Sequence, residues 1–538
     1  MDSGVPKTQT KEIIILEILI ILSALFRLLF SSTEVIYPDA CTYLSISKSI
    51  LNGKLSTDFR GGVELILPPL YPLMTSLFYL LFRSIELSAL MVSIFTGSLL
   101  IVPAYFLTGL IYGKKAARNK SRNKRLISAA FIFFSPVMIN WSVAMYTEAL
   151  FILLFISAIT IGLYALEREK GIWFFVTGSL VGLSYLTRIP GIIVLGILCG
   201  WIIIYLISKR FSVRKSITFT ALLFAGFILI TGPYLAHLHS ALGEWTLTGS
   251  YGSVTEVVMD EGVETVAGWE LLDVAKKEEG AFKKLSKKTT ANLRHYSYSL
   301  FKMLSVTLLF VIIGIIRGCK GLLNRDEIIK STYLLSFVIL YFLSLLILPV
   351  SPLIDERMRY LSPILPILLI LASGGIVHAN TWIEEYGKGK LWRSFAIPAM
   401  IVIVLVSYIP QYQMVSAGLH KFWEKERPVD IRKETGKWMK DNLPPPIRAM
   451  SRGPFVPYHA DGIFFLTPPT YEAVIRTARA NNIDYLILDR DVDYDLRPKL
   501  KFLFNPARIP EELKLIGGYT HPTTGEILMA VYKIRRYE

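Results

Sequence analysis

Acidic and basic side chains recur in this sequence at the ends of long apolar segments, where they can meet at one surface. Asp39, in the stretch YPDACTYL (37–44), follows an apolar segment that ends at Phe30. Glu148 opens another apolar segment in MYTEALF, and Arg188 closes one in YLTRIPG. A carboxylate can take a proton from a hydroxyl group, and arginine binds phosphate through paired hydrogen bonds. The set suits a reaction in which a nucleophile is deprotonated and an anionic group leaves.

A second charged group lies in PLIDERMRYLSPILP, between two apolar segments, and contains Glu356, Arg357 and Arg359. Charged side chains at membrane depth are costly, so a cluster of them indicates a functional site. We therefore expect Arg357 and Arg359, together with Arg188, to bind the phosphate of a substrate.

Each of these positions also has a structural explanation. Asp39 can cap a helix over 40–52, and Glu148 can lie favourably in a first helical turn. Arg188 can extend to the membrane interface, and the arginines of the second group can pair with the neighbouring acids. The functional interpretation therefore depends on the convergence of all these residues at one face of the membrane.

Metal and disulfide chemistry has little support in the sequence. The three cysteines, Cys41, Cys199 and Cys319, lie in different segments and form no CxxC motif. His237 and His239 are two positions apart, so they do not share a helix face and are not expected to bind a metal together.

The composition indicates a membrane protein with many spans. Of the 538 residues, 53% are hydrophobic and 19% are charged, and the mean hydropathy is +0.48. A soluble protein has about a quarter charged residues. The net charge of +16 does not indicate nucleic-acid binding, because many cations lie in short loops and no basic face carries interleaved aromatic residues. No cleavage pattern follows the apolar run 13–30, so we expect a retained first helix.

Eleven apolar segments have about the length that crosses a bilayer. A further block, 68–83, is short and opens with three prolines in five residues, so we expect it to lie in the interface. The loop 113–125 holds seven Lys or Arg residues and no acid, which favours the cytoplasm. This arrangement predicts a cytoplasmic N-terminus and an extracytoplasmic C-terminus. The predicted spans are 12–31, 87–112, 126–142, 147–166, 171–187, 190–208, 215–238, 299–317, 328–349, 358–378 and 394–412.

The chain divides into two predicted parts. Residues 1–413 form the membrane domain, with outer loops over 32–86 and 239–297. Residues 414–538 change in character and contain the strand-like runs IFFL, YLILD and ILMAVYKI, with the helix-like run YEAVIRTARANN between the first two. This pattern predicts a small extracytoplasmic α/β domain.

Several short motifs, in their order and spacing, resemble the GT-C membrane glycosyltransferases, which include the protein O-mannosyltransferases and the aminoarabinose transferases. The resemblance covers roughly residues 10–380. The motifs are Asp39 followed by ACTYL, an amphipathic segment ending in NGK, PPLYP at 68–72, the Thr-Glu pair at 147–148, LTRIPG at 186–191 and RYLSPILP at 359–366.

The resemblance implies both a fold and a reaction. The family transfers a sugar from a polyprenyl-phosphate carrier to an acceptor on the outer face of the membrane, with inversion at the sugar carbon. Asp39 would be the base that takes or orients the hydroxyl proton, and Glu148 would be a second catalytic residue that fixes the acceptor or the sugar. The residues expected to line the substrate cavity are Tyr43, Tyr71, Glu356 and Tyr360.

Two departures narrow the resemblance. Many relatives have a second acid directly after the first, where this chain has Ala40. This difference weakens the inference that the chain has protein O-mannosyltransferase activity. The oligosaccharyltransferase branch carries a WWD-type motif that this sequence lacks, which disfavours metal-dependent transfer of oligosaccharides to asparagine. No cofactor is therefore expected, although the sequence leaves a divalent metal open.

The sequence thus predicts a polytopic helical membrane enzyme of GT-C type with a small α/β domain. Its expected partners are a polyprenyl-phosphate-linked monosaccharide, a glycan, lipid or protein acceptor, and membrane lipids. A lipid or solute transporter is the alternative, but it would carry charges at the midplane and paired broken helices. A third possibility is a binding or scaffold protein in which the C-terminal part is the functional one. It would leave the charges at the outer end of the helical bundle unexplained.

Overall fold

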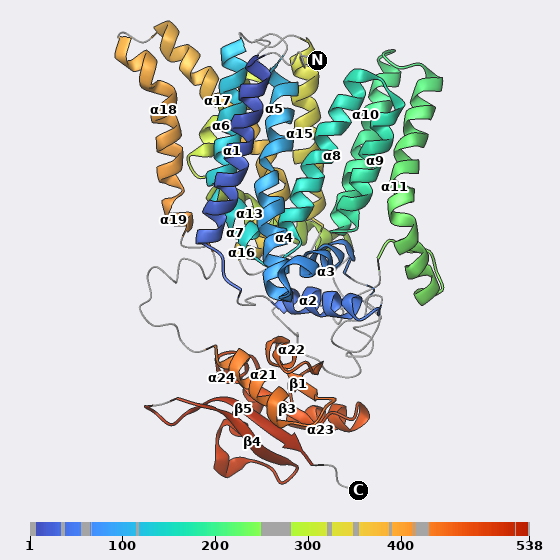
Figure 1. Cartoon of the computed structure of the whole chain (residues 1–538), viewed down its shortest axis with the longest axis vertical. Helices are drawn as coiled ribbons and strands as arrows, with labels where there is room; N and C mark the ends of the chain where they lie inside the picture. Colours follow the sequence, from blue (N-terminus) through green and yellow to red (C-terminus); the bar gives the residue numbers. More distant parts are fainter. Residues whose placement is uncertain are drawn as a thin grey trace.

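A helical bundle carries a small α/β domain at one end in the computed structural model (Figure 1). The long helices run side by side, and α2 and α3 lie across the end of the bundle that faces the C-terminal domain. The N-terminus lies at the other end of the bundle. The predicted fold class is therefore confirmed. The structure describes residues 7–33, 38–54, 65, 67–113, 118–248, 281–319, 325–347, 354–386, 390–412, 415, 430–521 and 523–535.

The bundle is built from helices that follow one another with short connections. Their bounds are α1 (Lys7–Leu29), α2 (Pro38–Leu51), α3 (Leu70–Phe82), α4 (Ile85–Leu99), α5 (Ile101–Tyr112), α6 (Arg118–Phe134), α7 (Pro136–Val143), α8 (Glu148–Arg168), α9 (Gly171–Tyr185), η1 (Ile189–Ile192), α10 (Ile193–Ile207), α11 (Val213–Leu242), α13 (Ala281–Leu304), α14 (Thr307–Cys319), α15 (Arg325–Leu345), α16 (Ile354–Leu361), η3 (Ser362–Ile364), α17 (Leu365–Tyr386), α18 (Lys390–Ser407) and α19 (Ile409–Tyr412).

Among the described residues, seven helices are long and apolar enough to cross a bilayer, and up to nine spans result if each of two bent helix pairs is one span. The sequence predicted eleven. The other two predicted spans correspond to α1, which carries Glu12, Glu17 and Arg27, and to α9, which has only 15 residues. Both helices run alongside the long ones in Figure 1.

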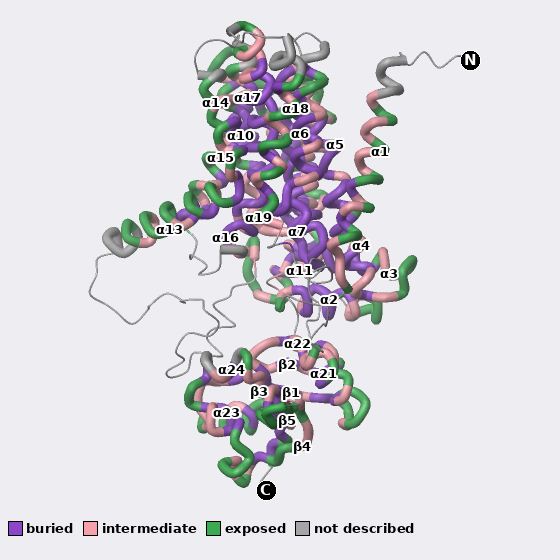
Figure 2. Tube along the Cα trace, turned by 90° about the vertical axis from the view of Figure 1, so that its left-hand side faces the viewer, coloured by how far each residue is buried: buried purple, intermediate pink, exposed green. Residues whose placement is uncertain are grey.

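Two of the predicted spans are broken. Helices α6 and α7 meet at an angle of 53°, where Pro136 follows the extended residue Ser135. Proline disfavours a helical residue before it, which explains the break. The prediction of one helix over 299–317 is wrong, because α13 and α14 meet at 104° around Ser305, which has a φ of 49°. Figure 2 shows α13 projecting sideways from the bundle, and its many lysines oppose insertion into hydrocarbon.

The block predicted to lie in the interface forms α3, which has 13 residues. A helix of this size is about 20 Å long, whereas the hydrocarbon core is about 30 Å thick. Several of its apolar side chains are exposed, among them Leu73, Leu77 and Leu81. A short helix with an exposed apolar face suits the membrane interface rather than a span.

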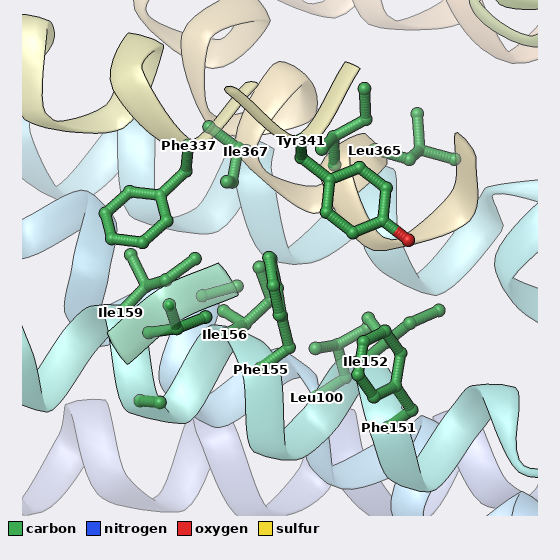
Figure 3. Close-up of a cluster of buried hydrophobic side chains, with 14 of the residues drawn as sticks. Leu100, Phe151, Ile152, Phe155, Ile156, Ile159, Phe337, Tyr341, Leu365 and Ile367 are labelled. Carbon is green, nitrogen blue, oxygen red and sulfur yellow. The ribbon is translucent and has the colours of Figure 1, made fainter. Parts of the chain in front are cut away.

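Helix α8 lies in the centre of the bundle and is buried along most of its length. Its side chains Phe155 and Ile159 pack against Phe337 and Tyr341 of α15 (Figure 3). The rings of Phe155 and Tyr341 meet edge to face, with their centres 5.7 Å apart. An apolar surface all around a helix favours such a central position. The first turn of α8 is consequently held firmly at the end of the bundle that faces the C-terminal domain.

The C-terminal domain contains one five-stranded sheet in the order β2-β1-β3-β5-β4. Strands β2, β1 and β3 are parallel, and β5 and β4 complete the sheet in antiparallel pairing. The bounds are α21 (Ile431–Asn442), β1 (Arg448–Ser451), α22 (Phe455–His459), β2 (Ile463–Leu466), α23 (Tyr471–Ala480), β3 (Tyr485–Asp489), α24 (Arg490–Leu496), η4 (Pro498–Phe504), η5 (Pro506–Arg508), β4 (Leu513–Thr520) and β5 (Ile527–Ile534).

Both faces of this sheet are covered. Alternate residues of a strand point to opposite faces, so Leu486 packs in the apolar cluster with Val474 of α23. Its neighbour Ile487 packs in the cluster with Met439 of α21 and Val456 of α22. The helices therefore lie on two sides of the sheet.

The predicted strands IFFL, YLILD and ILMAVYKI and the predicted helix YEAVIRTARANN correspond to β2, β3, β5 and α23. The sequence did not reveal β1, which has four residues, or β4, which contains Gly517 and Gly518 and an irregular register. The predicted domain boundary between residues 413 and 414 lies outside the described residues.

The domain contacts the bundle through α22 and the turn that follows it. Lys48 of α2 forms an ion pair with Asp461 at 2.9 Å and lies 4.3 Å from the ring centre of Tyr458. The Tyr458 hydroxyl donates a hydrogen bond of 2.7 Å to Glu86 of α4. Exposed ion pairs add little stability, but these contacts orient the domain over the end of the bundle.

Glycines allow α14 and α17 to approach closely. A Cβ atom added at Gly375 would overlap the carbonyl oxygen of Phe310, and one added at Gly314 would overlap that of Leu371. Helix α17 continues the segment that contains α16, so this contact also positions the charged residues of α16.

We predict that Gly375→Ala lowers the thermal stability of the protein in detergent or lipid. The added methyl group overpacks the helix contact, which typically costs about 1–3 kcal/mol. The matched control is Gly196→Ala in α10, where no atom lies within 4 Å of the added methyl. It should keep or raise the melting temperature, because alanine favours a helix. Equal melting temperatures for both variants would contradict the close approach.

Candidate active site

A cavity of about 650 Å³ lies where the end of the bundle meets the C-terminal domain. The C-terminal domain contributes residues of α21, of the segment from β1 to α22, and of the segment from β3 to α24. The bundle thus forms one wall of the cavity, and the C-terminal domain forms the other. Six of the nine predicted site residues line this cavity, namely Asp39, Tyr43, Arg188, Glu356, Arg359 and Tyr360.

Glu148 is fully buried beside this cavity and holds two guanidinium groups. Its Oε1 accepts hydrogen bonds from Nε of Arg359 and from Nη1 of Arg188. The hydroxyl of Thr147 lies 3.4 Å from Oε2. The two arginines are 211 and 40 positions away in the sequence, so one carboxylate joins three distant segments.

Local structure explains why these side chains reach one another. Helix α7 ends at Val143, a bend follows, and α8 begins at Glu148, where the helix dipole favours a carboxylate. Arg188 is the extended residue between α9 and η1, with a φ of −153°. Arg359 belongs to α16, whose continuation η3 contacts α8.

Asp39 lies in the first turn of α2, directly after Pro38. Proline is favoured at the first helical position. Nη1 of Arg359 donates a hydrogen bond of 3.0 Å to Oδ2 of Asp39, and 47% of the Asp39 side chain is exposed. Asp39 is therefore oriented by Arg359 and still accessible from the cavity.

Aromatic rings flank both guanidinium groups. The guanidinium carbon of Arg359 lies 4.3 Å from the ring centre of Tyr146, and that of Arg188 lies 6.0 Å from Tyr360 and 5.8 Å from Phe151. These distances allow cation–π attraction. Tyr146 was not predicted, and its sequence signal was its place two positions before Glu148.

Three predicted residues do not line the cavity. Glu148 lies behind the arginines that it binds, and Tyr71 is fully buried, with its hydroxyl donating to the carbonyl of Ala89 at 3.0 Å. Arg357 is also buried, with Nη1 3.1 Å from Nδ1 of His295 on α13. Residues two apart on a helix point to different faces, which explains why Arg359 reaches the cavity and Arg357 does not.

The C-terminal domain brings charged residues to the cavity that the sequence did not single out. Nε of Arg432 donates to Oδ2 of Asp489 at 2.6 Å, and its guanidinium lies 5.4 Å from the ring centre of Phe455. Asp493 is only 1% exposed, and burial raises its pKa to about 6. Arg452 lies on the same wall, and burial lowers its pKa. The available signal was the acidic run DRDVDYD directly after the predicted strand YLILD.

The described residues contain no group of three or more His, Cys, Asp or Glu side chains that could hold a metal ion. Asp39 and Glu148 instead share the guanidinium of Arg359. The site as described is thus built from carboxylate–arginine pairs.

Comparison with known proteins supports a common architecture. Residues 67–236 match the profile of the dolichyl-phosphate-mannose-protein mannosyltransferase family. The structure of ArnT from Cupriavidus metallidurans superimposes with a TM-score of 0.57 and 12% sequence identity, over 98% of each chain. The chain shares the fold of this membrane protein. The sequence has no significant match among curated proteins.

Two further structures share this fold and contain bound ligands. The oligosaccharyltransferase AglB from Archaeoglobus fulgidus, in complex with an inhibitory peptide and a dolichol-phosphate, has a TM-score of 0.56 and 13% identity, over 92% of this chain and 73% of that one. ArnT bound to undecaprenyl phosphate has a TM-score of 0.54 and 12% identity, over 97% of this chain and 98% of that one.

We predict that Glu148→Gln strongly destabilises this protein. Removing one partner of a buried ion pair leaves buried charge without compensation, which costs about 3–5 kcal/mol. The control is Glu169→Gln, which removes an ion pair with Lys215 in which both side chains are well exposed. That pair is worth at most about 1 kcal/mol. Thermal unfolding in lipid measures both variants, and similar shifts would contradict the central position of Glu148.

We also predict that Asp493 makes the stability of the C-terminal domain depend on pH. Its folded pKa of about 6 exceeds the ordinary 3.8, so the folded state binds the proton more tightly between these values. The domain therefore loses about 3 kcal/mol of stability as the pH rises from below the unfolded pKa to above the folded one, with most of the loss between about pH 4 and about pH 7. Besides burial, the neighbours that affect this pKa are Asp489, Arg497 and Arg452.

The variant Asp493→Asn should remove this dependence and raise the unfolding temperature of the domain at pH 7. The control is Asp491→Asn on the same helix, where the side chain is exposed. Thermal unfolding of the full chain between pH 4 and pH 8 gives the comparison. A pH profile that Asp493→Asn leaves unchanged would contradict the assignment.

Proposed function

We propose that this protein transfers a monosaccharide from a polyprenyl-phosphate carrier to an acceptor hydroxyl on the outer face of the membrane, with Asp39 as the base. The observation that carries the proposal is the chain of contacts from buried Glu148 through Arg359 to the accessible carboxylate of Asp39. These contacts place a proton acceptor, Asp39, beside the oriented positive charge of Arg359 in one cavity.

In the proposed reaction the acceptor hydroxyl hydrogen-bonds to Asp39. Its oxygen attacks the anomeric carbon of the donor sugar, and the bond from that carbon to the phosphate oxygen breaks. The proton passes to Asp39, and the electron pair leaves with the lipid phosphate. Direct displacement of this kind inverts the configuration at the anomeric carbon.

Arg359 and Arg188 are proposed to stabilise the departing phosphate. Both line the cavity, and the buried Glu148 fixes both through Oε1. Guanidinium groups that are already oriented stabilise developing negative charge without reorganising. In this scheme Glu148 is a positioning residue and not a group that touches substrate, and Arg357 is not part of the donor site.

The aromatic lining supports a sugar in this cavity. Tyr43, Tyr146 and Tyr360 line it together with Trp141. Aromatic faces provide flat apolar surfaces beside the charged groups, and a sugar ring likewise combines apolar C–H faces with a polar rim.

The orientation in the membrane is part of the proposal. The basic loop 113–125 favours a cytoplasmic position. The N-terminus and the C-terminal domain lie at opposite ends of the bundle in Figure 1. Together these features support a cytoplasmic N-terminus, a membrane domain over 1–413 and an extracytoplasmic domain over 414–538. The undecaprenyl phosphate bound to ArnT and the dolichol-phosphate bound to AglB support a polyprenyl-phosphate donor.

We predict that the purified protein in lipid consumes a polyprenyl-phosphate-linked monosaccharide from a panel of hexose and pentose donors. Asp39→Asn should lower turnover by about 10²–10⁴-fold, because the proton acceptor is lost. Release of radiolabelled sugar from the lipid measures the reaction. The control Asp441→Asn lies on an exposed position of α21 and should turn over like the wild type. Equal turnover by Asp39→Asn would remove Asp39 from the mechanism, and no consumption by the wild type would overturn the proposed activity.

A further inference from the structure

The C-terminal sheet has a crevice whose position follows from its topology. The chain passes from β1 through α22 to β2 on one side of β1, and then through α23 to β3 on the other side. Beyond its carboxyl end β1 continues into α22, which packs in the apolar cluster on one face of the sheet, whereas β3 continues through α24 into η4, which packs in the cluster on the other face. The connections therefore diverge between the carboxyl ends of β1 and β3, and ligands of open α/β sheets bind at such points.

The residues at this crevice line the same cavity as Asp39. Ser451, Arg452 and Gly453 follow or end β1, and Asp489 and Asp493 follow or end β3. All five line the cavity of about 650 Å³ that Asp39 and Arg359 line from the bundle. The crevice thus opens toward the proposed base.

Two polar groups at the crevice have unused hydrogen-bonding capacity. Oδ2 of the buried Asp493 accepts from the backbone N–H of Asp489 at 2.7 Å, but within the described part of the chain its Oδ1 has no hydrogen-bond partner. Nε of Arg452 likewise has none among the described residues. Buried polar groups are costly when unpaired, so such a pair indicates a ligand. One donor beside one acceptor complements a hydroxyl group, which both donates and accepts.

The surroundings favour a saccharide over a peptide. Phe455 lines the cavity and lies under the guanidinium of Arg432, which is itself held by Asp489. An aromatic face beside charged hydrogen-bonding groups matches the apolar face and hydroxyl rim of a sugar ring. An extended peptide would bind by adding to a strand edge, yet no described residue of the edge strands β2 and β4 lines the cavity.

We infer that the crevice between β1 and β3 is the acceptor subsite and that the acceptor is a saccharide. One of its hydroxyl groups hydrogen-bonds to Arg452 and Asp493, while another reaches Asp39 as the nucleophile. The inference rests on the proposed function, because it requires Asp39 to be the base. It gives the C-terminal domain a role in selecting the acceptor.

The test uses the full chain in lipid, with the donor that the wild type consumes. Methyl glycosides and short oligosaccharides are compared, as acceptors, with peptides that contain Ser or Thr. We expect transfer to saccharides. Asp493→Asn and Arg452→Gln should raise the KM for the saccharide 10–100-fold and change the KM for the donor less than twofold. The controls are Asp491→Asn and Arg508→Gln, both exposed and away from the cavity lining, and they should change neither constant.

A second measurement does not depend on turnover. Saturation-transfer NMR detects binding of the same glycosides to the wild type and to Asp493→Asn without donor. Binding that the variant loses supports the subsite even if no donor is consumed, so failure of the inference and failure of the proposed reaction are distinguishable. Unchanged acceptor KM and unchanged binding in both variants would overturn the subsite. Transfer to peptides with none to saccharides would overturn the saccharide assignment.

Discussion

The carboxylate of Glu148 is the group on which the rest of the candidate site depends. A buried charge is stable only when it is paired and hydrogen-bonded, and Glu148 meets this condition by binding both Arg359 and Arg188. The same contacts bring together α8, α16 and the turn after α9. Arg359 then extends the chain of charges to Asp39. The position of the exposed Asp39 carboxylate therefore depends on Glu148, which does not line the cavity.

The residues that hold the site in place and the residues that line the cavity lie in different parts of the fold. Helix α8 holds Glu148 rigidly because it is packed on all sides in the bundle core. The cavity itself lies at the surface of the bundle, and the C-terminal domain contributes its other wall. That domain is oriented by Lys48, Asp461, Tyr458 and Glu86. Its buried Asp493 reduces stability at neutral pH, a cost that is typical of functional positions.

Much of the fold was predictable from local patterns. Apolar segments of bilayer length revealed the spans, and short apolar runs revealed β2, β3 and β5. The failures have physical causes. Strand β1, with the sequence RAMS, has Arg448 and Ser451 at its ends and forms no apolar run, so it was missed although β2 is equally short. The helix over 299–317 was predicted to continue through Ser305 because apolar residues continue where the backbone turns. Within the site, spacing alone could not separate Arg357 from Arg359, since both flank the same membrane segment.

The sequence by itself determined that this protein is a polytopic membrane protein with a small α/β domain, and which residues at the ends of its apolar segments carry charge. These properties are local, because hydropathy and motif order depend only on neighbouring residues. Only the tertiary structure decided that Glu148 binds two arginines, that Arg357 turns toward His295, and that Arg452 and Asp493 line the same cavity as Asp39. Such pairings join segments from 40 to 320 positions apart in the sequence, and they are set by packing and by the need of each buried charge for a partner.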